Sequence, residues 1–540
     1  MPHGPRFYKN ALPTPEITQD SLQQTLVELQ TAVHDGVRLI ESKQPAGEDD
    51  GRGIFTGDLG IALTYLRLAH QSPSLTPPNH NTLSPAEFRS LAHSRIPDKS
   101  SPHDLAIGLL SPLAPKSPLA PPTLRILYHL SAGTAGDILD AELVVLGDAV
   151  KMALEHGATA VYHGHELGAD EVLFGRAGLL WTLLNIRRWE VEGEGVFDKR
   201  QKGLLDRVLA DETVRKLVEA IVRAGQEGGA ECQKILERKG ESLVAAQDGN
   251  VIPLMWVWMK GHYGLGWAHG LTGILSILLS APSEFLTPHL PSIAATIEVL
   301  CNTCLAEDGH LPTCIPPRSS RSHLVQICHG APAFLSLMAC ALRNREFFLA
   351  HWKPEWTKAI FRAVHRVWEE GLLTKGGGLC HGITGNALPL LMLYNALDED
   401  PNVLRDAWML SDGLELPVDP EGDPEDDYFY HRLADDFLSR GLAMLRHARE
   451  TQPYNQTPES VSNEYRMPDH PYSLFEGLAG TVCAWSEACV AIRRRLRKLE
   501  LRDEAGRRKR SHNLDAVVGE CKKQELGFPF LGGAGVTGLL

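Results

Sequence analysis

The sequence lacks the features that mark membrane, secreted and nucleic-acid-binding proteins. No apolar run reaches the ~18 residues that a membrane-spanning helix needs, and the most apolar run, Leu271–Leu279, is too short. No apolar segment follows Met1–Arg6, so we predict no secretory signal and expect a cytoplasmic protein. The 53 basic and 67 acidic residues give a net charge of −14, which argues against a broad nucleic-acid-binding surface.

Cysteines are too few for a disulfide scaffold. The chain has ten in 540 residues, and in a reducing cytosol they stay as thiols. The alternation of apolar and polar residues that is typical of strands is also nearly absent. We therefore predict an all-helical protein whose cysteines are free.

What the sequence does contain is a series of glycine-rich turns that open apolar helices. The pattern Gly-x-x-Gly, or a close variant, precedes an apolar helical segment near residues 57, 175, 270, 330, 382 and 477. The intervals are about 50–60 residues or somewhat under twice that, which is typical of stacked or circularly arranged repeats. Six motifs and one wide gap between 60 and 175 predict seven helical-hairpin units.

Three stretches stand apart from the repeated units. Residues 72–122 are rich in Pro and Ser and predict an inserted loop. Residues 410–430 are acidic and predict a second, solvated insertion. Residues 493–510 are basic and predict an exposed helix; peripheral contact with an acidic lipid surface or a partner is the alternative.

Two of the repeats carry the same Cys-His-Gly sequence. Cys328-His329-Gly330 and Cys380-His381-Gly382 are 52 positions apart, too far for the local ligand pairs of a zinc finger. Successive repeats bring corresponding positions together, and Cys and His side by side are zinc ligands or a nucleophile–base pair. Cys301, Cys304 and Cys314 also resemble a ligand set, but the first two are predicted to share a helix face.

Together these motifs resemble those of the LanC-like family, the eukaryotic relatives of the bacterial lanthionine cyclases. The resemblance rests on His269-Gly-Leu-Thr-Gly273, Cys328-His-Gly-Ala-Pro332, Lys375-Gly-Gly-Gly-Leu-Cys-His-Gly382 and Ser473-Leu-Phe-Glu-Gly-Leu-Ala-Gly480, with Asp170–Arg176 and Arg6–Asn10 in support. It covers nearly the whole chain and implies one domain over residues 1–540, an α/α toroid of seven inner helices ringed by seven outer ones. The chain departs from the family pattern at residues 117–128, which lack the second repeat's glycines, and at Ala333, where a glycine is usual.

The resemblance also implies a metal site and a chemistry. By it, Cys328, Cys380 and His381 bind a zinc ion, glutathione is a ligand or co-substrate, and a thiol adds to dehydroalanine or dehydrobutyrine in peptides and proteins. Three protein ligands leave the fourth tetrahedral position open, as in catalytic zinc sites. A thiol that binds there loses its proton readily.

The addition needs a proton donor for the α-carbon, and a histidine suits this near pH 7. His269 is the candidate, because its motif places it at the mouth of another inner helix. Glu171 or Asp170 would act as a base or orient a group, with Glu171 preferred for its spacing to Gly175. Lys375 and Arg6 are candidates to bind the carboxylates of glutathione. A purely structural or surface role is the alternative for each.

The leading hypothesis is an enzyme, a zinc-dependent glutathione transferase that forms C–S bonds with dehydroamino acids. The alternative is a regulatory or adaptor protein that binds glutathione without turnover, and the metal ligands do not separate the two. An α/α-toroid glycosidase needs two carboxylates in the cavity, where these motifs offer Cys and His. A lantibiotic cyclase needs a partner dehydratase and a precursor peptide.

Overall fold

The computed structural model describes most of the chain, with gaps. The described residues are 5–47, 53–77, 82–97, 105–133, 140–162, 164–190, 196–239, 252–316, 323–399, 427–455, 465–507 and 514–532. Helices dominate them. No described helix combines the length and the hydropathy that a membrane span needs.

Seven inner helices form a closed ring. In the described part of the chain, each packs against the next, and the last packs against the first. They are α3 (Asp58–Gln71), α5 (Ala120–Ala132), α7 (Arg176–Glu190), α10 (Leu271–Leu279), α13 (Ala331–Arg343), α16 (Ile383–Glu399) and α19 (Leu478–Arg507). Six of them begin at the Gly-x-x-Gly motifs. The seventh, α5, fills the wide gap between two motifs, so the ring is complete although residues 117–128 lack the glycines.

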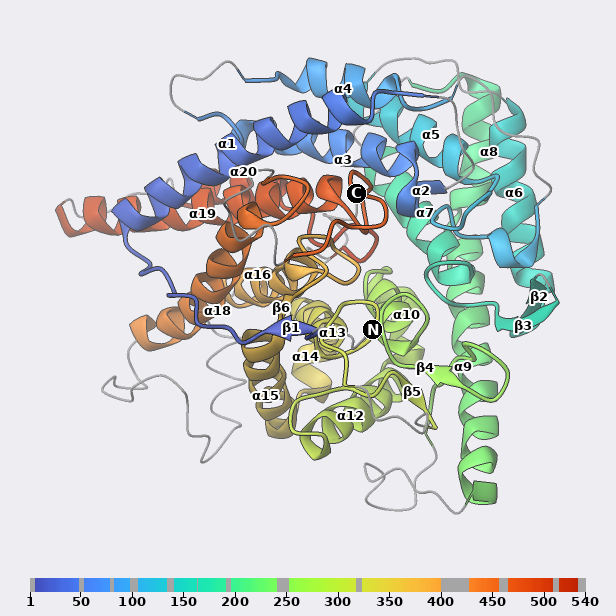
Figure 1. The fold of residues 1–540 in the computed structure, drawn as a ribbon. Coiled ribbons are helices and arrows are strands. Elements are labelled where there is room, and N and C mark those ends of the chain that lie inside the picture. Colours follow the sequence, from blue (N-terminus) through green and yellow to red (C-terminus); the bar gives the residue numbers. More distant parts are fainter. Residues whose placement is uncertain are drawn as a thin grey trace.

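Each inner helix is preceded in the chain by an outer one. The outer helices are α1 (Gln19–Lys43), α4 (Pro85–His93), α6 (Asp140–Glu155), α9 (Asp211–Lys239), α12 (Leu290–Ala306), α15 (Pro354–Glu370) and α18 (Asp427–His447). They lie around the periphery in Figure 1, with α4 on α3, α15 on α13 and α18 on α16. The described residues thus confirm the predicted α/α toroid of seven inner and seven outer helices.

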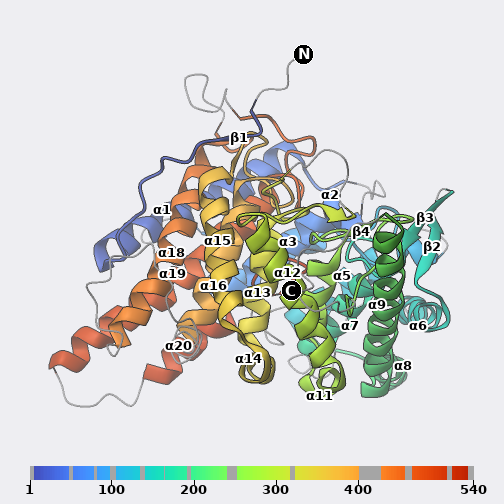
Figure 2. The same ribbon diagram turned by 90° about the horizontal axis from the view of Figure 1, so that it is seen from below.

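Shorter elements connect these helices. They are α2 (Gly53–Thr56), α8 (Lys199–Leu209), α11 (Ser283–Leu286), α14 (Arg345–His351) and α20 (Leu514–Lys523), the 3₁₀ turns η1 (Ser72–Ser74), η2 (Ile107–Leu109), η3 (Thr287–His289) and η4 (Ala448–Glu450), and the strands β1 (Phe7–Tyr8), β2 (Thr159–Tyr162), β3 (His165–Gly168), β4 (Tyr263–Gly264), β5 (Cys314–Ile315) and β6 (Leu372–Leu373). The strands form the antiparallel pairs β1–β6, β2–β3 and β4–β5. Figure 2 shows β1 and β4 toward one end of the bundle and α11 and α14 at the other.

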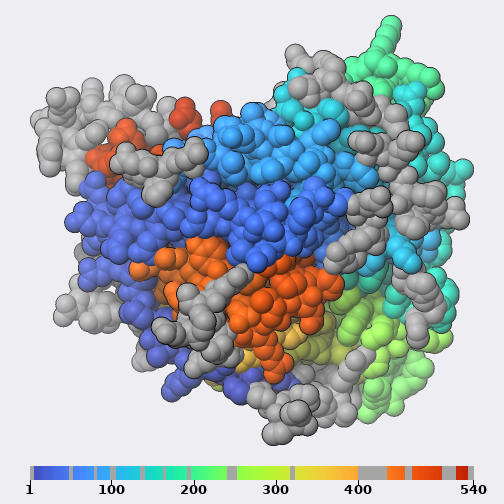
Figure 3. Space-filling model, turned by 45° about the horizontal axis from the view of Figure 1, so that its top comes forward, coloured from blue at the N-terminus to red at the C-terminus, as the bar shows by residue number. Residues whose placement is uncertain are grey.

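The two ends of the chain close the ring. Helix α1 packs along α19, and Arg446 and Arg449 of the C-terminal half both pair with Glu28 of α1. Figure 3 shows this junction as blue and orange segments side by side on one face. The closure explains why the N-terminal residues 5–8 reach a loop that lies more than 360 positions later.

The interior of the ring holds the segment that follows α20. Phe530 stacks on Trp181 with ring centroids 3.5 Å apart, and Phe528 lies 5.9 Å from Trp267. Glu487 accepts a hydrogen bond from the Leu526 amide at 3.0 Å. These residues are almost fully buried, so this segment belongs to the hydrophobic core.

One of the predicted irregular stretches is corrected, and another lies mostly outside the described residues. Residues 72–122 are not one inserted loop, because they contain the outer helix α4 and the start of α5. A capping box begins α4: Ser84 accepts from the Glu87 amide, and the Glu87 carboxylate accepts from the Ser84 amide. Most of 410–430 lies outside the described residues, and 427–430 begin α18.

Residues 493–507 of the basic stretch form the end of α19 and are not simply exposed, and residues 508–510 lie outside the described residues. Arg494 is buried and pairs with Asp398 at 3.0 Å and Glu525 at 2.7 Å, while Arg495 pairs with Asp435 at 2.6 Å. These arginines tie α19 to α16, to α18 and to the segment in the ring. The predicted helix is confirmed, but its exposure is wrong for Arg494 and Arg495, because a run of charges indicates a solvated face unless its acidic partners, far away in sequence, are known.

Candidate metal centre

The glycine motifs fold the chain into a tight loop before each inner helix. A Cβ on Gly273 would come within 2.1 Å of the Trp267 carbonyl oxygen, and one on Gly385 within 1.7 Å of that of Leu379. The second glycine of the motif is therefore needed because the loop folds back onto the first helical turn. The residues that lie between this carbonyl and this glycine in the sequence are held at the ends of the inner helices. They include His269, Cys380 and His381.

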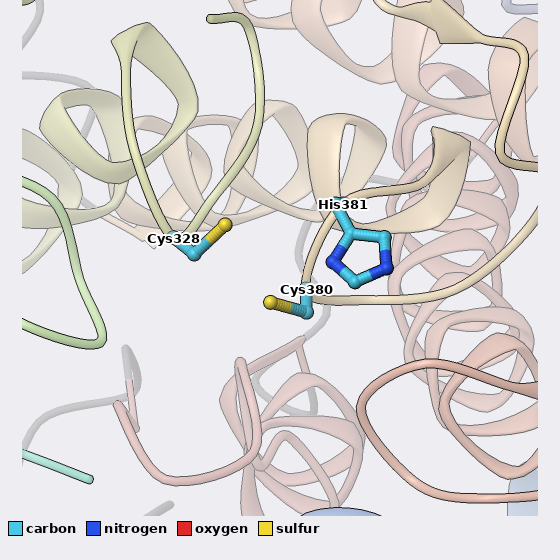
Figure 4. Close-up of side chains that lie close together, drawn as sticks. All are labelled: Cys328, Cys380 and His381. Atoms are coloured by element: carbon cyan, nitrogen blue, oxygen red, sulfur yellow. The ribbon is translucent and has the colours of Figure 1, made fainter. Parts of the chain in front are cut away.

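Cys328, Cys380 and His381 converge. Their two sulfurs and one imidazole nitrogen all lie within 4.8 Å of one another, and they form the one such group in the part of the chain that is described. Figure 4 shows the two thiols pointing toward each other from separate loops, with the imidazole beside them. Both cysteines are 6% exposed. Successive repeats thus bring their Cys-His sequences together, as predicted.

Backbone and side-chain contacts fix the two loops. The Cys328 amide donates to the Cys380 carbonyl at 3.3 Å, and the Cys380 amide donates to the Phe475 carbonyl at 2.6 Å. Asn386 on α16 donates to the Val325 carbonyl at 2.9 Å. The Gln326 amide lies 3.0 Å from the Cys328 sulfur. Three inner-helix loops, before α13, α16 and α19, therefore lock together around the cysteines.

The two thiols share a proton unequally. The Cys380 thiol donates to the Cys328 sulfur, which lowers the pKa of Cys328 well below its ordinary value, with a further hydrogen bond from His381 and the charge of His329 in support. The pKa of Cys380 is raised by the same contact and by burial. Cys328 is therefore the more acidic of the two thiols.

This group fits a zinc ion. Tetrahedral zinc takes thiolate sulfur at about 2.3 Å and imidazole nitrogen at about 2.0 Å, so its ligand atoms lie roughly 3.5 Å apart. A cluster whose three atoms all fall within 4.8 Å of each other suits that geometry. A thiolate–thiol pair with an adjoining imidazole is also the soft donor set that zinc prefers. Three protein ligands leave one position for another molecule.

The other cysteines named in the sequence are structural. Cys301 and Cys304 are fully buried on α12, where burial raises the pKa of both, that of Cys304 to about 12. Cys314 is on β5. The prediction that Cys301 and Cys304 share a helix face rather than a metal is consistent with these positions.

His269 and Glu171 form a pair beside the cysteines. The imidazole Nδ1 lies 2.9 Å from the Glu171 carboxylate, and Glu171 is 2% exposed. Burial lowers the pKa of His269, but the charge and hydrogen bond of Glu171 outweigh it and leave the pKa raised. The Trp258 ring stacks on His269 with centroids 5.3 Å apart. Glu171 and Trp258 therefore orient the imidazole, and Glu171 favours its protonated form.

Asp170 faces a different partner. The Arg176 guanidinium donates to both of its oxygens, at 2.6 and 2.9 Å, and also reaches the carbonyl oxygens of Ala153 and Gly157. Burial raises the pKa of Asp170 to about 6. Of the two candidate carboxylates, Glu171 serves His269 and Asp170 anchors α7.

Arg6 and Lys375 are brought together at the rim. Strand β1 pairs with β6, and the Thr374 amide donates to the Arg6 carbonyl at 3.0 Å, which sets Arg6 next to the residue that precedes Lys375. Both side chains are exposed, and the positive charge of Lys375 acts on Cys380. The two predicted cations are therefore close together along the paired strands, and Lys375 is near enough to Cys380 to act on it electrostatically.

Sequence reasoning missed several residues of this region. Trp258 comes from a tight turn between Trp258 and His262 with no motif of its own. Arg466 donates its amide to the Thr374 carbonyl at 2.8 Å and adds a third cation to the rim. Gln326 and Asn386 could have been found from their places beside the Cys-His sequences.

Comparison with known proteins agrees with this geometry. A family model described as lanthionine synthetase C-like protein matches residues 144–412, which include His269 and all three residues of the cysteine cluster. The chain belongs to the lanthionine synthetase C-like family. Helices α3, α5 and α19 lie outside the matched residues, and they complete the LanC-like ring.

Two curated relatives match part of the chain at low sequence identity. The chain is 26% identical over 314 residues to the glutathione S-transferase LANCL1 of Danio rerio, which covers 58% of this chain and 57% of that protein. It is also 26% identical over 319 residues to the LanC-like protein GCL1 of Arabidopsis thaliana, with 58% and 54% covered. The chain spans about half the length of the curated relatives it matches.

Proposed function

We propose that this LanC-like protein is a zinc-dependent thiol transferase that adds glutathione to dehydroalanine or dehydrobutyrine residues in peptides or proteins. The convergence of Cys328, Cys380 and His381 beside the His269–Glu171 pair carries the proposal. The name of the zebrafish relative, a glutathione S-transferase, supports the choice of thiol. Glutathione chemistry also needs reduced cysteines, so we propose a cytoplasmic location.

The cysteine cluster would hold the metal. Zinc bound by Cys328, Cys380 and His381 would lower the pKa of a thiol that enters the open position. Arg6 and Lys375 stand at the rim, where a fork and a point charge suit the two carboxylates of glutathione. These two side chains would orient the incoming tripeptide with its thiol toward the cluster.

His269 supplies the proton that the addition requires. When sulfur bonds to the β-carbon, the double bond becomes an enolate, and the α-carbon must then receive a proton. Glu171 keeps the pKa of His269 raised and fixes its Nδ1, so Nε2 can present a proton to the cavity. Trp258 covers one face of the ring and restricts its motion.

Zinc content and adduct formation in one set of variants test this function. Wild type, Cys380→Ala and the control Cys521→Ala, a cysteine on α20 away from the cluster, are purified under reducing conditions. Each is analysed for zinc and incubated with glutathione and a dehydroalanine peptide. We expect about one zinc per chain and adduct by mass spectrometry for wild type and control, and neither for Cys380→Ala.

Other results point elsewhere. If wild type binds zinc and glutathione but forms no adduct, the chain is a glutathione-binding protein without turnover. If wild type has no zinc, the cysteine cluster is a set of core thiols and the proposal is wrong.

A further inference from the structure

A second histidine–glutamate pair lies in the loop before α19. His470 Nδ1 is 2.7 Å from the Glu476 carboxylate, the same atoms and nearly the same distance as in the His269–Glu171 pair. His470 is 35% exposed and Glu476 16%, so the pair is open to solvent on one side only. Its members belong to the Ser473–Gly480 motif and the loop that precedes it.

This pair adjoins the cysteine cluster. The loop 465–477 runs along the loop 374–380, with the Phe475 carbonyl accepting from Cys380 and the Arg466 amide donating to Thr374. A Cβ on Gly378 would lie 2.3 Å from the Glu476 carbonyl oxygen. The Glu476 carboxylate is also close enough to act on the Cys380 thiol electrostatically.

The two pairs stand on opposite sides of the cluster. Following the ring, Glu171 and His269 precede α7 and α10, the cysteines precede α13 and α16, and Glu476 precedes α19. The addition of a thiol to a dehydroamino acid needs two proton transfers, one from sulfur and one to the α-carbon. The chain therefore offers one histidine–glutamate pair for each transfer.

We propose that His470 is the base that removes the thiol proton of the incoming glutathione, with Glu476 as its positioning residue. This rests on the proposed function. Because Glu476 holds Nδ1, Nε2 is the ring nitrogen that would accept the proton from sulfur. The sulfur–β-carbon bond forms as the carbon–carbon π bond breaks, and His269 gives its proton to the α-carbon. His470 then loses a proton to water and His269 regains one.

The test compares thiols of different acidity. His470→Gln and Glu476→Gln are assayed for adduct with glutathione and with an aromatic thiol, which is already largely ionised at neutral pH. His365→Gln serves as the control, because His365 also pairs with a glutamate, Glu369, on the surface of α15. Zinc content and glutathione binding are measured for every variant.

We expect His470→Gln to lower the rate with glutathione by about 10²-fold. It should keep zinc and glutathione binding, and lose less than about fivefold with the aromatic thiol, which needs no base. Glu476→Gln should show the same pattern more weakly. If wild type forms adduct and His470→Gln has an unchanged rate, or loses the same factor with both thiols, His470 is not the base. Either result would leave the proposed function standing. Absence of adduct from wild type would overturn the proposed function as well.

Discussion

Glu171 illustrates how one buried carboxylate sets the state of its neighbour. Burial raises the pKa of Glu171, and the charge and hydrogen bond of His269 act in the opposite direction. The same contact keeps the pKa of His269 raised. A histidine whose pKa is raised stays protonated further into the neutral range, which is what a proton donor in a thiol addition needs.

Replacing Glu171 by Gln tests this coupling. The change removes the charge that raises the pKa of His269, so the imidazole loses its proton at a lower pH. We expect the alkaline limb of the pH–rate profile for adduct formation to move to lower pH, with a roughly tenfold lower rate at neutral pH. The profile is measured from about pH 5.5 to about pH 9, which brackets the ordinary titration range of histidine.

Glu166→Gln is the control, because Glu166 is a surface residue paired with Lys260. A profile for Glu171→Gln that coincides with those of wild type and the control would show that His269 is not the group that titrates.

The sequence indicated which residues lie close together more reliably than how their side chains are oriented. The repeated Cys-His-Gly sequence indicated that two loops meet, because equivalent positions of a repeat occupy equivalent places, and the family resemblance selected Cys328, Cys380 and His381 from them. It did not separate Asp170 from Glu171, since adjacent residues in a loop face different neighbours, and only packing shows that Arg176 takes the first. Trp258 carried no sequence signal at all.

At the scale of elements, the glycine motifs are steric requirements. The second glycines at Gly60, Gly273, Gly385 and Gly480 all lie where a Cβ would meet the carbonyl oxygen six residues earlier. The helix propensity of glycine is poor, so each motif lowers the stability of its helix. In return, the loop before the helix can fold back onto the first turn. The gain is a rigid turn that holds one functional residue at the rim.

Gly385→Ala should therefore damage the metal site. The new Cβ would come 1.7 Å from the Leu379 carbonyl, so the loop that carries Cys380 and His381 must shift. We expect zinc per chain to fall well below one, together with a loss of stability of about 2 kcal/mol or more. Zinc analysis and chemical denaturation measure the two effects.

Gly203→Ala is the matched change on an outer element. Gly203 lies on α8 and is exposed, and a Cβ added to it would meet no other atom within 4 Å. We expect unchanged zinc and a gain of roughly 0.5–1 kcal/mol in unfolding free energy. Equal zinc content in both glycine variants would contradict the steric account.

In the molecule as a whole, the segment after α20 links the ring to the cysteine cluster. Phe530 contacts Trp181 and lies 6.4 Å from Phe475, whose carbonyl accepts from Cys380. Phe475 also stacks on Trp267, whose amide donates to the Ile327 carbonyl. An aromatic stack thus runs from the middle of the ring to both cysteine loops.

Phe530→Ala removes the centre of that stack. A fully buried phenylalanine cut back to alanine costs about 3–5 kcal/mol, and we expect a loss of that size with weakened retention of zinc against a chelator. Leu349→Ala on α14 is the control, because Leu349 is 62% exposed and its truncation should change stability by less than about 0.5 kcal/mol. If Phe530→Ala lowers stability but leaves zinc retention unchanged, the aromatic stack does not support metal binding.

Glu487 makes the stability of the ring depend on pH. Burial raises its pKa to about 7, against the charge of Arg67 and the hydrogen bonds from Leu526 and Gln71. The folded state therefore holds this proton more tightly than the unfolded state. Its stabilising contribution is complete below the ordinary pKa of 4.5 and is lost as pH rises to about 7.

Replacing Glu487 by Gln removes this titration. Between about pH 5 and about pH 7 the unfolding free energy of wild type should fall relative to that of the variant, by at most about 1.4 kcal/mol per pH unit. Urea denaturation at three pH values across this window gives both series. If the unfolding free energies of wild type and variant change in parallel with pH, the Glu487 carboxylate is ionised across the whole window.

The repeat number, the helical class and the two Cys-His loops could be predicted from the sequence alone. Each of these depends on a local requirement repeated along the chain: a glycine turn, an apolar helix, a Cys-His pair. Only the tertiary structure decided that Arg494 and Arg495 are buried, that the segment around Phe530 fills the ring, and that His470 pairs with Glu476 beside Cys380. The reason is that these contacts join residues through the closed ring, and neither the direction of a side chain nor the partner of a charge is encoded in its immediate neighbours.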